Sequence, residues 1–179
     1  MEYWSKSIRL DGWDYRIPWF YFVTICTKDR CHYFGEIRDG IMGLSEQGCA
    51  AWYFWNEIPN HFDNVKLDEF VVMPNHVHGI IQILPDENGS HPVGMLHATC
   101  LQDININDRM SIISPKPGSL STIIRSYKSA HTRWCNQKNY DFEWQSRFHD
   151  HIIRNYRALN NIRRYIKMNP EDWESDSQF

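Results

Sequence analysis

The sequence predicts an α+β fold, in which helices pack on an antiparallel sheet. Two observations lead to this prediction. Short runs rich in aromatic and β-branched residues, which are typical of strands, occur at 19–27 and within 67–84. Segments with the apolar spacing of helices lie at 119–139 and 156–173. The overall order of strands and helices, roughly β-β-α-β-β-α-β-α, indicates this fold class.

The first part of the chain is expected to form strands around one helix. Residues 19–27 (WFYFVTICT) predict the first strand, and residues 28–43 predict a turn with a second short strand. Ser45 is the expected N-cap of a helix within 44–62 that runs toward Pro59.

Residues 67–84 are expected to hold one or two strands, with Pro74 and Asn75 as an interruption. Proline is tolerated in a sheet only at an edge, at the start of a strand or at a bulge. We therefore expect a fresh stretch of strand just after this pair. Residues 85–118 are rich in Gly, Pro, Asn and Asp and lack periodicity, which predicts a long loop insertion.

The C-terminal third is expected to contain two helices. The first spans 119–139, with Ser119 or Ser121 as its cap, and an extended piece follows within 142–155. The second spans 156–173.

The buried face of this second helix is predicted by the spacing of Leu159, Ile162 and Ile166. Asn169 is expected to end the helix, because a residue that precedes proline avoids the helical region.

The bulk properties indicate a single domain, 1–179, with enough apolar material, 42% of the residues, for a real core. No apolar run approaches the ~20 residues of a membrane span, and the N-terminus lacks an apolar signal-peptide core. We therefore expect a cytoplasmic protein with no membrane partner. Five cysteines, an odd number without a CxxC pair, argue against a disulfide framework or a structural zinc site.

The net charge of −3 conceals an uneven distribution. Residues 116–167 carry eleven Lys and Arg against three acids, a net charge of +8, so the rest of the chain carries −11. Such a split indicates that the C-terminal third meets an anion, for example a phosphate backbone. Solvated helix faces are the alternative explanation.

The run VVMPNHVHGIIQI, residues 71–83, places His76 and His78 two positions apart in a strand-like context. Side chains at i and i+2 of a strand point to the same face, so the two imidazoles are expected to lie together. Two neutral imidazoles can bind a divalent ion, and packing or hydrogen bonding is an equally open alternative. Two ligands do not complete a metal site, so others must come from elsewhere.

The last predicted helix offers further candidates. Tyr165 and Asn169 are four residues apart, so they lie on one helix face. Tyr165 supplies a hydroxyl, and Asn169 supplies an amide oxygen that can bind a cation. The alternative is a half-buried core tyrosine and an ordinary helix end.

Five motifs follow one another along the chain: YFVTICT, VVMPNHVHGIIQI, SLSTIIRSYKSAHTRW, WQSRFHDHIIRN and IRRYIKMNPEDW. Together they resemble the REP-associated tyrosine transposases, which belong to the insertion-sequence transposases of the HUH single-strand endonuclease superfamily. HUH denotes His, a bulky apolar residue and His, here His76-Val77-His78. The resemblance covers most of the chain, as far as Trp173.

The resemblance implies a ferredoxin-like sheet with the HUH strand at its centre and two C-terminal helices. It implies that Tyr165 is the nucleophile and that His76 and His78 bind the metal. It makes Asn169 the third ligand, at a position where relatives often carry Gln. The implied activity is a transposase or nickase dependent on Mg²⁺ or Mn²⁺. Such an enzyme cleaves and rejoins single-stranded or hairpin DNA through a 5′-phosphotyrosine, as a monomer or homodimer.

The basic C-terminal third is expected to hold the DNA backbone. The candidate contacts are Arg125, Lys128, Arg147, Arg154, Arg163, Arg164 and Lys167.

The sequence is compatible with several alternatives. Tyr127 is a rival nucleophile, and the second His-x-His pair, His149 and His151, is a rival metal site. The chain could instead be a domesticated protein that binds hairpin DNA without cutting it, or an ordinary metal hydrolase that uses the histidine pair.

Overall fold

The computed structural model describes residues 13–85 and 117–173. The strands of the main sheet are β1 (Phe20–Cys26), β4 (Val65–Met73), β5 (His76–Ile83) and β6 (His149–Ile152). The helices are α1 (Glu46–Asn56), α2 (Ile58–His61), α4 (Leu120–Gln137) and α5 (Tyr156–Met168). A short turn of 3-10 helix, η1 (Lys28–Arg30), and the hairpin of β2 (Gly35–Arg38) and β3 (Ile41–Leu44) lie between β1 and α1. Nearly all of the loop insertion expected at 85–118 lies outside the described residues.

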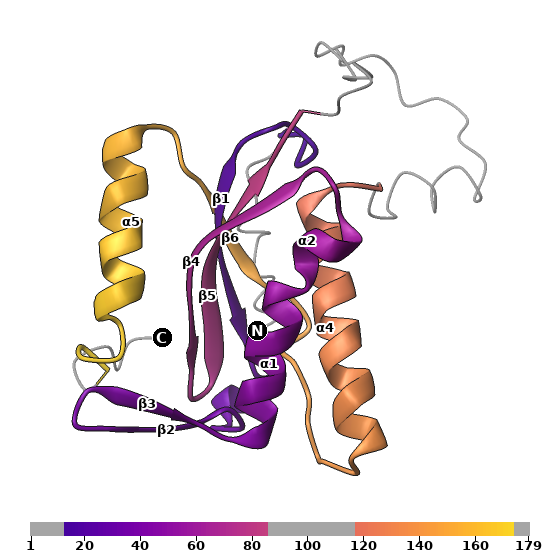
Figure 1. Ribbon diagram of the computed structural model, residues 1–179, viewed down its shortest axis with the longest axis vertical. Helices are drawn as coiled ribbons and strands as arrows, with labels where there is room; N and C mark the ends of the chain where they lie inside the picture. The colour runs from indigo at the N-terminus through magenta and orange to yellow at the C-terminus, as the bar shows by residue number, and fades with distance from the viewer. Residues whose placement is uncertain (1–12, 86–116, 174–179) are drawn as a thin grey trace, which may run out of the picture.

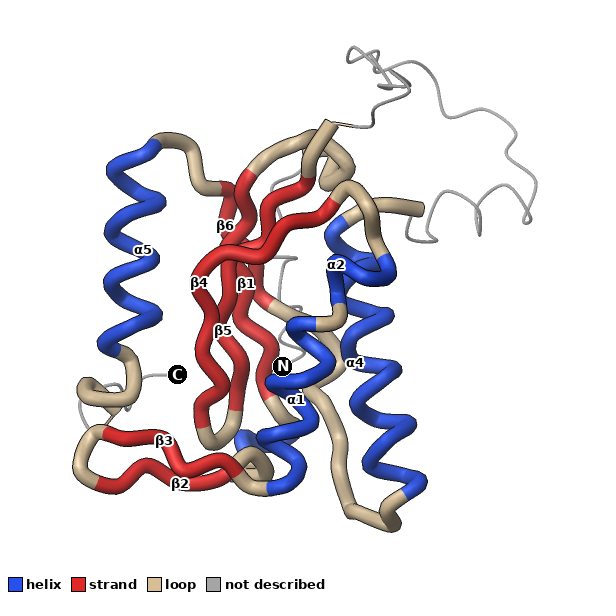
Figure 2. The backbone as a smooth tube through the Cα atoms, in the orientation of Figure 1, coloured by secondary structure: helices blue, strands red, loops and turns tan. Residues whose placement is uncertain are grey.

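The four strands of the main sheet are antiparallel and lie in the order β4-β5-β1-β6 (Figure 2). Along the chain, the four strands and the two longer helices that connect them follow the order β1, α1, β4, β5, α4, β6. This is the ferredoxin-like α+β arrangement, so the expected fold class is confirmed. Strand β5, which begins at His76, lies inside the sheet between β4 and β1, as expected for the HUH motif.

Helices cover both faces of the sheet, because alternate residues of its strands are apolar on each side. Helices α1, α2 and α4 lie on one face, and α5 lies on the other (Figure 1). The larger core cluster joins Val23 and Val77 of the sheet to Trp55 of α1 and Ile123 of α4. A smaller cluster joins Ile80 to the buried face of α5. The molecule therefore has three layers, with the sheet in the middle.

Local sequence signals set several boundaries. Ser45 and Ser119 accept hydrogen bonds at the starts of α1 and α4, so Ser119 is the cap of α4. Pro74 and Asn75 form the turn between β4 and β5, where an interruption was expected. Two details differ from the expectation. The segment 28–43 holds two strands rather than one, and α5 ends at Met168, because a turn begins at the Asn-Pro step.

Gly79 is required where β5 passes under α1. A Cβ atom at this position would lie 2.2 Å from Cζ2 of Trp55, whose ring is fully buried. We expect Gly79→Ala to lower the free energy of unfolding by about 1–3 kcal/mol through overpacking. Denaturant unfolding measures this change.

Gly43→Ala is the matched control, because a Cβ at Gly43 would lie an ordinary 3.5 Å from its nearest neighbour, the carbonyl oxygen of Glu36. A Gly79→Ala protein within about 0.5 kcal/mol of the unsubstituted chain would contradict the close packing of β5 against Trp55.

Candidate active site

The two histidines of β5 lie side by side on the sheet face that carries α5. Their exposed fractions are 2% for His76 and 1% for His78, and their ring centroids are 4.3 Å apart. Val77 between them belongs to the core on the opposite face. On the adjacent strand, Cys26 pairs with His76 and Thr24 pairs with His78. The alternation of β5 thus brings the two imidazoles together, as the sequence predicted.

The contacts of His76 leave one ring nitrogen open. Its Nδ1 lies 2.7 Å from Oδ1 of Asn75, which is an acceptor, so Nδ1 carries the proton and donates it. Its Nε2 is buried and has no hydrogen-bond partner within the part of the chain that the structure describes. A buried nitrogen lone pair without a partner costs free energy, and a metal ion would supply the partner.

His78 is held by oxygen atoms on both sides of its ring. Nδ1 lies 2.9 Å from Oγ1 of Thr24, and Nε2 lies 3.3 Å from the hydroxyl of Tyr165. If Nδ1 donates to the threonine oxygen, the lone pair of Nε2 faces the tyrosine. Histidines that bind a metal through one ring nitrogen are commonly oriented by a hydrogen bond from the other ring nitrogen, the role that Nδ1 and Thr24 would have here.

Both imidazoles are uncharged at neutral pH. Burial, with a smaller contribution from the positive charge of Arg30, lowers the pKa of His76 to about 4. Burial, and then the neighbouring His76, lower the pKa of His78 well below its usual value. Neutral imidazole is the form that binds metal ions, so the pair needs no proton release before it can act as a ligand.

Tyr165 reaches the histidines of the sheet from helix α5, which packs on the same face. Helix α5 is fixed on the sheet by its buried Leu159 and Ile166. Tyr165 lies on the same side of this helix, with its ring centroid 5.4 Å from that of His78 and 6.2 Å from that of Phe22. Its hydroxyl therefore points to the histidine pair of its own chain.

The chain after α5 closes the His76 end of the site. Asn169 immediately follows α5 and is 1% exposed, one helical turn beyond Tyr165. The ring of Trp173 then lies 6.1 Å from the ring of His76, and 5.7 Å from the ring of His32. The predicted nucleophile and the predicted third ligand thus come from one helix and its end.

The donor set fits a divalent cation that takes its remaining ligands from outside the protein. Within residues 13–85 and 117–173, no three or more His, Cys, Asp or Glu side chains lie close enough together to hold a metal ion by themselves. If the amide oxygen of Asn169 joins the two imidazoles, as the sequence predicts, positions would remain for water or phosphate oxygen, which suits Mg²⁺ or Mn²⁺ with a bound substrate.

The rival nucleophile, Tyr127, lies on the far side of the sheet. It is 2% exposed, and its hydroxyl donates to the carbonyl oxygen of Ala51 at 3.2 Å. Complete burial raises the pKa of this phenol above its ordinary value. The sheet separates Tyr127 from the histidine pair, so only Tyr165 of these two tyrosines can share a substrate with His78.

The candidate DNA contacts do not form one patch. Four of the arginines are exposed: Arg125 on α4, Arg147 and Arg154 on either side of β6, and Arg164 on α5. Helices α4 and α5 lie on opposite faces of the sheet (Figure 1), so Arg125 and Arg164 belong to different layers.

The other three candidates have protein partners. Lys128 donates to the carbonyl oxygen of Gln145 at 2.5 Å, and burial lowers its pKa to about 8. Arg163 pairs with Asp68, and Lys167 pairs with Glu69.

The Asp68–Arg163 ion pair fastens α5 to β4. Nε and Nη2 of Arg163 donate to the two carboxylate oxygens at 2.8 and 2.5 Å, and the arginine holds the pKa of Asp68 below its ordinary value. We expect Asp68→Asn to cost about 1–2 kcal/mol of unfolding free energy at pH 7. Because the folded-state pKa is lowered, the pair stabilises the fold above the unfolded pKa of about 3.9. That stability is lost as pH falls through the folded pKa.

The test is denaturant unfolding of Asp68→Asn and the unsubstituted chain between pH 7 and pH 3, where the difference should shrink. Glu69→Gln is the control, because its pair with Lys167 joins the same two elements but is more exposed. We expect less than about 1 kcal/mol from that change. Equal losses in the two variants would contradict a special role for Asp68.

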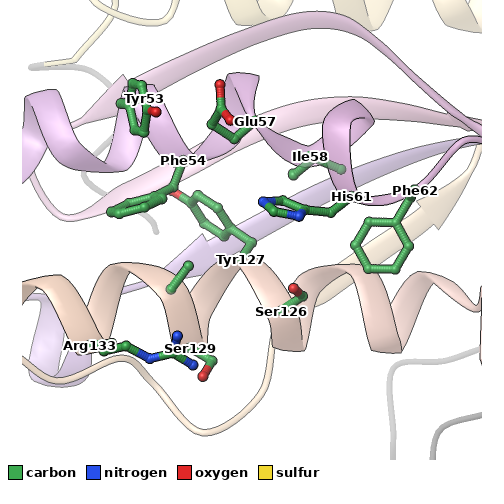
Figure 3. A pocket seen from close by; sticks show the side chains of 11 residues that line it. Tyr53, Phe54, Glu57, Ile58, His61, Phe62, Ser126, Tyr127, Ser129 and Arg133 are labelled. Carbon is green, nitrogen blue, oxygen red and sulfur yellow. The ribbon is translucent and has the colours of Figure 1, made fainter.

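A cavity of about 380 Å³ opens on the opposite face of the molecule, between α1, α2 and α4 (Figure 3). Its walls include Tyr53, Glu57 and His61 on one side and Ser126 and Arg133 on the other. The candidate site is therefore a set of buried side chains between sheet and α5, and it is separate from this cavity.

Three residues that contact the histidine pair were not among the site residues predicted from the sequence. Thr24 and Asn75 each hold a histidine ring, and Trp173 packs beside His76. Thr24 could have been found from strand pairing, because it is an inward polar residue in an otherwise apolar strand. Asn75 could have been found from its place directly before His76. Nothing in the sequence indicates the position of Trp173, which depends on how the chain turns after α5.

Comparisons with known proteins support the fold. No family model matches the chain. An uncharacterized protein of Haemophilus influenzae is 36% identical over 179 residues, which cover 97% of this chain and 92% of that protein. A solved structure of a REP-associated tyrosine transposase bound to a REP hairpin aligns with a TM-score of 0.58 and 19% identity. That alignment covers 92% of this chain and 73% of the other.

The chain therefore belongs to one family with the Haemophilus influenzae protein, and it shares its fold with the REP-associated tyrosine transposase. The fold expected from the motif resemblance is confirmed. None of the helices within the described residues is both long and apolar enough to cross a membrane.

Proposed function

We propose that this protein is a metal-dependent transposase or nickase that cleaves and rejoins single-stranded DNA through a 5′-phosphotyrosine intermediate. One observation carries the proposal. The hydroxyl of Tyr165 lies 3.3 Å from Nε2 of His78, and the ring of His78 lies beside that of His76, whose buried Nε2 has no hydrogen-bond partner among the described residues. A nucleophile next to two neutral imidazoles in one chain is an arrangement suited to attack on a phosphodiester.

The metal ligands are His76, His78 and Asn169, and the cation is Mg²⁺ or Mn²⁺. When bound, such a cation would polarise a non-bridging oxygen of the scissile phosphate. The protein's own contribution is to hold the imidazoles neutral and oriented, through burial and through Asn75 and Thr24.

Tyr165 supplies the nucleophile. Its hydroxyl oxygen forms a bond to phosphorus and gives up its proton, while the bond from phosphorus to the 3′ oxygen breaks. The leaving strand takes a proton and ends in a free 3′-hydroxyl. The other strand stays linked to the protein by its 5′ phosphate. This is transesterification, so a later attack by a 3′-hydroxyl can rejoin the DNA without another energy source.

The substrate is single-stranded or hairpin DNA. The scissile phosphate must reach the histidines of β5 and Tyr165 of α5 at the same time. Unpaired DNA can adopt such a position more easily than a duplex. The basic stretch 116–167 and its exposed Arg147 and Arg154 supply counter-charges for the backbone. The solved transposase of the same fold is bound to a REP hairpin, and this supports a hairpin target here.

The proposal is tested with a hairpin oligonucleotide carrying an unpaired flank. A label at the 3′ end should move to the protein band on a denaturing gel with Mn²⁺, because the 3′ fragment keeps the 5′ phosphate. A label at the 5′ end should appear in a free, shorter strand. EDTA should abolish both signals. A mobility shift without any adduct, in every metal tried, would instead identify a protein that binds hairpins without cutting.

A further inference from the structure

A second histidine pair lies on the same face of the sheet as the first. His149 and His151 are both in β6, and they pair with Thr24 and Phe22 of β1. On the other side of β1, Thr24 pairs with His78 and Phe22 pairs with Ile80, both in β5. Residues directly opposite in a sheet point to the same face. The imidazoles of His149 and His151 therefore project from the α5 side, and Asp150 projects from the other side.

This pair is open to solvent, unlike the first. Both histidines are exposed, whereas His76 and His78 are buried. Helix α5 packs on β4 and β5, and β6 is an edge strand of the sheet. In the described segments, neither imidazole has a hydrogen bond, ion pair or ring contact. Each imidazole can therefore offer the lone pair of one ring nitrogen to an ion from solution.

We propose that His149 and His151 form a second metal site, selective for transition-metal ions such as Ni²⁺, Cu²⁺ and Zn²⁺. The two Cα atoms are roughly 7 Å apart along a regular strand, so both rings can lean over one ion. Imidazole suits these ions, whereas Mg²⁺ requires oxygen ligands. Water or an anion completes the coordination, because no third His, Cys, Asp or Glu of the described residues joins the pair.

The second site is separate from the candidate active site. Two strand spacings, about 10 Å, separate β6 from β5 across β1. Two-metal catalytic centres hold their ions about 3.5–4 Å apart. The two histidine pairs therefore cannot share one substrate atom. An ion on β6 would instead add positive charge to the open sheet face beside the active site.

Titration calorimetry of the untagged, full-length protein with NiCl₂ tests this inference. The background is His76→Gln/His78→Gln, which removes the buried pair. We expect one equivalent of Ni²⁺ to be lost when either His149 or His151 is changed to Gln, and MgCl₂ to give no heat that depends on these residues. Cu²⁺ electron paramagnetic resonance should show nitrogen couplings that vanish in the same variants.

His61→Gln is the matched control, because His61 is an exposed histidine on α2 with no histidine two residues away. It should leave the number of bound Ni²⁺ ions unchanged. Circular dichroism establishes that each variant is folded. Unchanged Ni²⁺ stoichiometry in folded His149→Gln and His151→Gln would overturn the inference. This test does not depend on cleavage, so its outcome stands apart from the proposed function.

Discussion

Tyr165→Phe is expected to abolish the covalent protein–DNA adduct while leaving the protein folded. Phenylalanine has no hydroxyl oxygen to bond to phosphorus, so adduct formation should fall by about 10⁶-fold, the scale seen when a nucleophile is removed. The structural cost is small. The variant loses one 3.3 Å contact to His78, worth about 1 kcal/mol, and keeps the ring that packs beside Phe22. Gel analysis of 3′-labelled DNA with Mn²⁺ measures the loss.

Tyr156→Phe is the control for this experiment. Tyr156 begins the same helix and is 73% exposed, so it presents a more accessible hydroxyl that does not face the histidine pair. Its variant should form the adduct at the rate of the unsubstituted chain. An adduct that survives in Tyr165→Phe and disappears in Tyr156→Phe would place the nucleophile at the start of α5 and would refute the proposed site.

His76→Gln and His78→Gln are expected to remove both Mn²⁺ binding and cleavage. Each change deletes one of two imidazole ligands at a buried position, so we expect at least a ~100-fold loss of metal affinity. The loss of activity should be at least as large. Glutamine keeps a polar side chain, which limits the damage to packing. Mn²⁺ binding followed by electron paramagnetic resonance separates loss of metal from loss of fold.

Saturating Mn²⁺ offers a second readout of the same pair. If the histidines act as ligands, high Mn²⁺ should restore part of the cleavage in each single variant but not in the double variant. His61→Gln should behave as the unsubstituted chain. Full activity in His76→Gln/His78→Gln would show that the pair is structural, since its buried position alone is compatible with packing.

The sequence predicted the fold class because the local signals agree with the tertiary structure. The strand at 19–27, the caps Ser45 and Ser119, and the turn at Pro74 are each specified by residues close in the chain. The order of strands in the sheet depends on long-range pairing, so it came only with the family resemblance. The β2–β3 hairpin was half missed, because Gly43 and the exposed Ile41 weaken the strand pattern of β3.

The candidate site was predictable in its residue types and not in its surroundings. Alternation placed His76 and His78 on one face, and helical spacing placed Tyr165 with Asn169. Periodicity cannot say which helix face meets which sheet face, so the 3.3 Å approach of Tyr165 to His78 needed the structure. Charge composition indicated an anionic partner. It could not show that Arg163 and Lys167 already pair with acids of β4.

The most direct test of the central claim is to identify the residue that carries the DNA. The adduct formed with the hairpin oligonucleotide and Mn²⁺ would be treated with nuclease and protease, and the remaining peptide sequenced by tandem mass spectrometry. We predict a nucleotide joined through its 5′ phosphate to the side-chain oxygen of Tyr165. A nucleotide linked through its phosphate to Tyr127, to Tyr156 or to any other residue would contradict the claim.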